Sequence, residues 1–121
     1  MLDEKELERL CHGRIIYADL MNSANSAPAG PHYAVILDSD ENIKKSRTYN
    51  VVAISHNSAI DSTFIMPVPP RTGLDGFIVG SWLAKVHELG IKEAHRWKLL
   101  PPEMIKVIEL VRAADAARKA T

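Results

Sequence analysis

Short apolar runs alternate with polar, glycine- and proline-rich stretches along most of this chain, a pattern typical of strands joined by turns. The runs are rich in β-branched and aromatic residues, which fit a pleated sheet. They predict strands over residues 14–20, 33–37, 50–54, 63–68 and 77–86. The run over 33–37 is nearly all apolar, so we expect it to be buried on both faces.

Two residues refine this strand pattern. Pro67 places the fourth strand at a sheet edge or at a strand end, because proline has no N–H to donate. Gly80 indicates a bulge in the fifth strand. The second half of that strand also fits a helix, and this alternative stays open.

Helical signals occur at both ends of the chain. A short helix is predicted over residues 3–11, with Asp3 as its cap and Glu6 three residues later. A second helix begins at Pro101, since proline suits the first turn. Its apolar residues recur at helical spacing: Met104, Ile105, Val107, Ile108, Leu110 and Val111. The final alanine-rich residues are expected to fray.

The connecting segments differ in character. Residues 21–31 (MNSANSAPAGP) form a loop of small and polar residues, long enough to suggest a functional role. Residues 38–47 are predicted as a charged turn region, 57–62 as a polar loop and 69–76 as a turn-rich connector. The pattern over 87–99 supports no assignment.

Five short strands followed by one terminal helix predict a mainly β (α+β) fold, a small barrel whose opening or face the helix covers. Length alone indicates a single domain over residues 1–121. We divide it into an N-terminal helical extension (1–12), the barrel, and a C-terminal helix (101–120).

Charge and cysteine content narrow the functional classes. Fifteen basic and fifteen acidic residues give no net charge, so net charge provides no attraction for nucleic acid. The single cysteine, Cys11, excludes an internal disulfide and suits a reducing compartment. No apolar run is long enough for a membrane span, and the acidic start is unlike a secretory signal. These features predict a soluble cytoplasmic protein.

Known cofactor and metal motifs are missing from the sequence. It contains no Walker loop, no GxGxxG after a strand, no HExxH and no CxxC. The five histidines are scattered; His87 and His95 would share a face only if their segment were helical. We therefore expect no metal and no cofactor.

The candidate chemistry lies at two strand ends. His32 enters the second strand, while Ser55 and His56 follow the third, so pairing of these strands would bring all three together. Two imidazoles can divide acid and base work, which suits RNA cleavage: one takes the 2′-OH proton and the other protonates the leaving 5′ oxygen. Ser55 would bind a phosphate oxygen. Further phosphate contacts would come from Arg14, Arg47 and Arg71.

The same residues allow a simpler interpretation. Both histidines can be partly exposed residues at strand ends with no catalytic role, and pattern alone favours this reading. The aromatic residues could stack on bases, but their small number fits core packing better: Trp82, Trp97, Tyr17, Tyr33, Tyr49 and the two phenylalanines.

The order of several short motifs resembles the MazF/PemK-type toxins of toxin–antitoxin systems, over about residues 13–112. The family's first strand begins Gly-[Asp/Glu]-Ile-Val and ends in Asp-Phe or similar. Its second follows Gly-x-Arg-Pro, its third carries Val-Val-Ala-x-Ile-Thr-Ser, and Pro-Glu-Met precedes its terminal helix. The counterparts here are GRIIYADL (13–20), GPHYAVIL (30–37), VVAISH (51–56), the Gly73-Leu74 turn, Ser81 and KLLPPEM (98–104).

This resemblance implies an SH3-like barrel of five to seven strands, a homodimer, and metal-independent endoribonuclease activity on single-stranded RNA. It also implies neutralisation by a cognate antitoxin. The family's catalytic arginine matches His32, and its threonine matches Ser55. Serine keeps the hydroxyl, whereas histidine replaces a permanent cation with a titratable group.

Two functional hypotheses follow. The first is a toxin-like endoribonuclease in which His32, Ser55 and His56 act on RNA. The second is a catalytically inactive barrel that binds a protein or a nucleic acid, an alternative suggested by the zero net charge and by the histidine at the arginine position.

Overall fold

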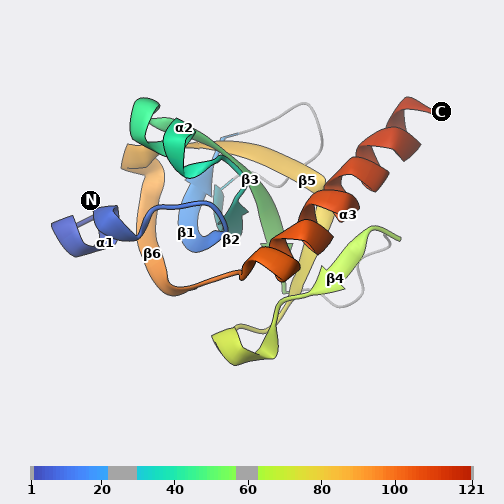
Figure 1. The fold of residues 1–121 in the computed structure, drawn as a ribbon, viewed down its shortest axis with the longest axis horizontal. Coiled ribbons are helices and arrows are strands. Elements are labelled where there is room, and N and C mark those ends of the chain that lie inside the picture. The colour runs from blue at the N-terminus through green and yellow to red at the C-terminus, as the bar shows by residue number, and fades with distance from the viewer. Residues whose placement is uncertain (1, 22–29, 57–62, 121) are drawn as a thin grey trace.

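Six antiparallel strands form one sheet in the order β4-β5-β3-β2-β1-β6 (Figure 1). The computed structural model describes residues 2–21, 30–56 and 63–120. The strands are β1 (Arg14–Leu20), β2 (Gly30–Ile36), β3 (Thr48–Ser55), β4 (Ile65–Pro67), β5 (Phe77–His87) and β6 (Ile91–Lys98). The helices are α1 (Glu4–Arg9), α2 (Asp40–Lys45) and α3 (Pro101–Lys119), with short 3₁₀ turns η1 (Pro70–Thr72) and η2 (Glu88–Gly90).

The sheet coils on itself and stays open at its two edge strands, β4 and β6. Directly after β1, Met21 forms a bridge with Lys85 of β5, and its N–H donates to the Lys85 carbonyl at 2.9 Å. This bridge links two strands that are not neighbours in the sheet. The predicted mainly β fold with a terminal helix is confirmed, and the barrel is incomplete.

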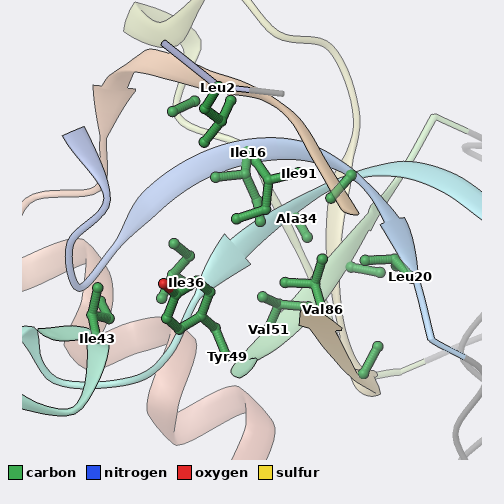
Figure 2. Packing of buried hydrophobic residues seen from close by; sticks show 14 residues of the cluster. Leu2, Ile16, Leu20, Ala34, Ile36, Ile43, Tyr49, Val51, Val86 and Ile91 are labelled. Carbon is green, nitrogen blue, oxygen red and sulfur yellow. The ribbon is translucent and has the colours of Figure 1, made fainter. Parts of the chain in front are cut away.

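Both faces of the central strands are buried. Side chains alternate across a strand, so one set points into the barrel and includes Ile16, Ala34, Val51 and Val86 (Figure 2). The opposite set packs beneath α3, where Met104 and Val107 contact it: Ile15, Val35, Val52, Ile54 and Ile78. Two-sided burial explains why the strands are continuous apolar runs, as we expected for the second strand, where Ala34, Val35 and Ile36 are fully buried.

The N-terminal helix α1 covers an edge of the sheet. The Asp3 carboxylate accepts from the Glu6 N–H at 2.8 Å, which confirms the predicted cap. The Glu6 carboxylate accepts from the N–H of Ala94 at 3.2 Å, and the Arg9 guanidinium donates to the Ala94 carbonyl at 3.1 Å. Side chains of α1 therefore satisfy backbone groups that the edge strand β6 would otherwise expose.

Two segments differ from the sequence prediction in secondary structure. The region predicted as a charged turn contains α2, a six-residue helix capped by Ser39 that buries only Ile43, so its apolar periodicity is too short to detect. The unassigned region 87–99 supplies β6, whose burial alternates poorly because it lies at a sheet edge.

The other predicted elements agree closely with the structure. Residues Phe77–His87 are one strand, so the helical alternative for its second half is wrong. The terminal helix continues to Lys119, and Asp115 pairs there with Arg118 at 2.7 Å and Lys119 at 3.0 Å. The predicted loop over 57–62 and most of the one over 21–31 lie outside the described residues.

Gly80 lies where the β3–β5 pairing becomes irregular, since Val52 pairs with Leu83 while Ile54 pairs with Ile78. This confirms the predicted bulge. The backbone of α3 passes directly over it: a Cβ on Gly80 would lie 2.9 Å from both the Leu110 carbonyl oxygen and its Cγ. Glycine at this position allows α3 to dock closely on the sheet.

We therefore expect Gly80→Ala to lower the free energy of unfolding by about 1–3 kcal/mol, the usual range for overpacking a core. Gly90→Ala is the matched control, because its added Cβ would meet nothing nearer than 3.4 Å. Chemical denaturation of both variants measures the difference. Equal stability of the two variants would contradict the close docking of α3.

Candidate functional site

His32 and Ser55 lie on adjacent strands and on the same side of the sheet. The β2–β3 register pairs Ala34 with Ala53, and the alternation of side chains from that pair puts His32 and Ser55 on the same side of the sheet. His32 is partly exposed, whereas Ser55 retains only 6% of its surface. A buried hydroxyl and a partly exposed imidazole thus lie on the barrel side of adjacent strands.

His56 lies on the other side of the sheet, because it follows Ser55 and consecutive side chains alternate. Its ring meets that of Tyr33 edge-on, with centroids 5.8 Å apart. Tyr33 in turn follows His32. The structure therefore places His32 and Ser55 on one side of the sheet and His56 on the other.

Gly76 holds the end of β3 in place. A Cβ at this position would lie 2.6 Å from the Ser55 carbonyl oxygen and 3.4 Å from His56 Nδ1, and its φ of 134° is unfavourable for other residues. Sequence reasoning did not identify this residue. The Asp75-Gly76 pair, a turn signal, could have indicated it.

Arg14 is held within the fold. Its Nε donates to the Arg9 carbonyl at 2.6 Å, and its Nη1 donates to the carbonyls of His95 and Arg96 at 3.3 and 3.0 Å. These bonds join β1, β6 and the end of α1. The guanidinium that we proposed for phosphate is therefore committed to backbone oxygens.

Arg47 is exposed and precedes β3. At about 3.3 Å per residue, the eight positions to Ser55 span roughly 25 Å. It lies at the opposite end of that strand from His32 and Ser55. A phosphate held between those two residues would therefore lie out of its reach.

Arg71 belongs to a third cluster. Its Nη2 donates to the Lys98 carbonyl at 2.9 Å and to the Glu103 carboxylate, and its guanidinium lies 6.0 Å from the centre of the Trp97 ring. Arg96 approaches the same ring at 5.3 Å. This cluster attaches η1 to the start of α3, so the Arg71 guanidinium already has partners within the fold.

Other histidines are similarly engaged by the backbone. Nδ1 of His87 accepts from the Leu89 N–H, and Nδ1 of His95 accepts from the Trp97 N–H, each at 3.1 Å. Burial lowers the pKa of His95. In the described part of the chain, no three histidine, cysteine or acidic side chains gather closely enough to hold a metal ion. Nor does any described helix have the length and apolar character needed to cross a membrane.

A pocket of about 360 Å³ lies away from the His32–Ser55 pair. It is bounded by His12 and Asp40 and by the first turns of α3, with Leu99, Met104 and Ile108 as its apolar wall. His12 Nδ1 lies 3.1 Å from the carbonyls of both Leu37 and Asp38, so this nitrogen carries the proton. None of the candidate catalytic or phosphate-binding residues from the sequence analysis lines this pocket.

The structure resembles known toxins. A MazF from Deinococcus radiodurans matches with a TM-score of 0.74 at 9% identity, over 88% of this chain and 96% of that one. An endoribonuclease from a Mycobacterial species, in complex with its cognate antitoxin, gives 0.68 at 12% identity over 89% and 94%. A MazE–MazF complex from Deinococcus radiodurans gives 0.66 at 10% identity over 86% and 92%.

Neither the protein-family models nor the curated proteins yield a match to this sequence. The structural likeness covers nearly the whole of each chain, and at such low identity it concerns the fold. This chain has the fold of the MazF endoribonuclease toxins.

The Arg71–Glu103 contact generates a prediction about pH. Partial burial raises the pKa of the Glu103 carboxyl, but hydrogen bonds from Arg71 and from the Leu100 N–H outweigh it, so that its pKa lies below the ordinary 4.5. Its stabilising contribution is therefore complete above pH 4.5 and is lost as the pH falls through the lower, folded-state value. We expect Glu103→Gln to lose less stability than the parent on acidification.

Thermal unfolding between neutral pH and about pH 3 measures this difference. Glu109→Gln, at an exposed carboxylate of the same helix, is the control and should follow the parent. Parallel curves for the parent and for Glu103→Gln would argue against a native-state role for this contact.

Proposed function

We propose that this chain is a toxin-like endoribonuclease that cleaves single-stranded RNA without a metal ion. The carrying observation is the β2–β3 pairing, from which His32 and Ser55 fall on the same side of adjacent strands. These are the positions at which the resembled family has its arginine and threonine. The MazF-like fold supports the assignment.

The reaction would use His32 as the base. Its neutral imidazole accepts the 2′-OH proton, the 2′ oxygen attacks the neighbouring phosphorus, and the bond from phosphorus to the 5′ oxygen breaks. An acid returns a proton to that oxygen, which leaves a 2′,3′-cyclic phosphate and a 5′-hydroxyl. The Ser55 hydroxyl would donate to a non-bridging phosphate oxygen, where negative charge develops.

His56 is the candidate acid. It directly follows Ser55, so a phosphate bound at the end of β3 would lie between residues on both sides of the sheet. The three arginines proposed from the sequence have no place in this scheme, because Arg14 and Arg71 bind other groups and Arg47 lies far along β3.

The proposed function includes its partners. The similar structures include toxin–antitoxin complexes, which supports an antitoxin as a partner of this chain. We further propose that the chain acts as a homodimer in the cytoplasm, where its RNA substrate is found.

A second candidate function is an inactive barrel that binds a protein or a nucleic acid. The low exposure of Ser55 and the engagement of Arg14 and Arg71 by protein groups favour it. A binding module would form a complex with its partner and would tolerate Ser55→Ala.

The purified chain should cleave a long single-stranded RNA in the presence of a chelator. His32→Ala and Ser55→Ala should each reduce the rate by about 100-fold or more, because general acid–base catalysis contributes that much. Lys45→Ala, at an exposed residue of α2, should cleave like the parent. Gel analysis of end-labelled RNA reports the rate and the cyclic phosphate end.

Absence of cleavage by the parent, together with normal growth of cells that express it, would exclude the nuclease and favour the binding module. Cleavage that His32→Ala leaves unchanged would exclude the proposed base. Circular dichroism of each variant separates loss of activity from loss of fold.

A further inference from the structure

Three aromatic rings adjoin on the face of the sheet opposite His32 and Ser55. Tyr17 and Tyr33 are paired across β1 and β2, with ring centroids 4.9 Å apart and planes inclined by 54°. His56 meets Tyr33 at 5.8 Å. We call these three residues the ring cluster.

The ring cluster lies beyond the part of this face that α3 covers. One pleat back along the strands, Ile15 and Val35 are fully buried. At the next positions, Tyr17 and Tyr33 are partly exposed, and His56 is exposed. Exposure therefore increases along this face toward the strand ends that carry His32 and Ser55, and the three rings keep partly exposed surface there.

Two members of the ring cluster are sequence neighbours of the candidate catalytic pair, His32 and Ser55. Tyr33 follows His32, and His56 follows Ser55. A nucleotide strand that crosses the ends of β2 and β3 with a phosphate at Ser55 would therefore pass these rings with its neighbouring bases. Unpaired bases stack on aromatic side chains regardless of sequence.

The charges around the rings favour bases over phosphates. Glu93 pairs with Tyr17 in the β1–β6 register, and the nearby Asp19 lies 3.6 Å from Lys92. Two carboxylates beside one paired cation would repel a phosphate. Burial, and next Glu93 and Tyr17, raise the pKa of Tyr33, so its phenol stays protonated and can donate to a base.

From this arrangement we infer that the Tyr17 and Tyr33 rings form a stacking subsite for unpaired RNA bases next to the cleaved phosphate, with the candidate acid His56 at its edge. The inference rests on the proposed ribonuclease function and adds a binding surface to it. Affinity at this subsite comes from ring contact with the bases.

Binding is measured by fluorescence anisotropy with a labelled single-stranded RNA of about ten nucleotides, within the usual site size. Its riboses carry 2′-O-methyl groups, so the proposed reaction cannot cleave it. Since a stacked base contributes about 1–3 kcal/mol, Tyr17→Leu and Tyr33→Leu should each weaken binding about 5- to 150-fold. Trp97→Leu removes an aromatic ring outside the cluster and should bind like the parent.

A second probe separates the contribution of the bases to binding from that of the sugar–phosphate backbone. On an RNA backbone of the same length without bases, Tyr17→Leu and Tyr33→Leu should bind as the parent does. Equal weakening on both probes, or equal weakening by Trp97→Leu, would overturn the inference. Matching melting temperatures show that the variants are folded.

The outcomes separate this inference from the proposed function. Variants that bind RNA normally, in a parent that cleaves, would refute the subsite and leave the nuclease intact. A parent that never cleaves but loses RNA affinity on Tyr33→Leu would refute the nuclease and keep the subsite. Normal RNA binding with loss of a protein partner would assign the rings to that partner and overturn the inference.

Discussion

Burial of both faces of the central strands is the constraint on which the rest of this structure depends. Each fully buried Val or Ile contributes roughly 1.5–3 kcal/mol, and such residues fill successive positions of β1, β2 and β3. Because side chains alternate along a strand, the buried positions also fix which face of the sheet each residue at a strand end points to. His32 and Ser55 continue the barrel-facing set, while Tyr33 and His56 continue the set that α3 covers. Packing of the hydrophobic core therefore determines on which face of the sheet each candidate site residue lies.

The charged residues of the fold mostly stabilise edges and joints. Arg14 joins β1 and β6 to the end of α1, and Arg71 attaches η1 to α3. Glu6 and Arg9 form hydrogen bonds with the backbone of the edge strand β6. With these groups engaged, the pair at the strand ends has a titratable imidazole where the resembled toxins have an arginine. The proposed chemistry therefore depends on protonation at His32, whereas in those toxins a permanent cation would stabilise the transition state.

Much of the fold was readable from local patterns. Strands with two buried faces give long apolar runs, and caps and prolines mark helix starts, so β1, β3, β5 and α3 were predicted to within two residues of their ends. The strand β2 begins at Gly30, three residues before its predicted start. The misses share one physical cause. The helix α2 buries a single residue, and β6 at the sheet edge mixes charged and apolar positions, so neither carries a clear period.

The sequence by itself determined five of the six strands that the structure describes, the helix that follows them, and the place of His32 and Ser55 near strand ends. Only the tertiary structure decided which side of the sheet each residue faces and which arginines are engaged. Arg14 binds carbonyls of His95 and Arg96, and Arg71 binds Glu103, which are partners far away in sequence. Strand propensity is a local property of side chains, whereas register and long-range hydrogen bonds arise from packing between elements, and no local pattern encodes them.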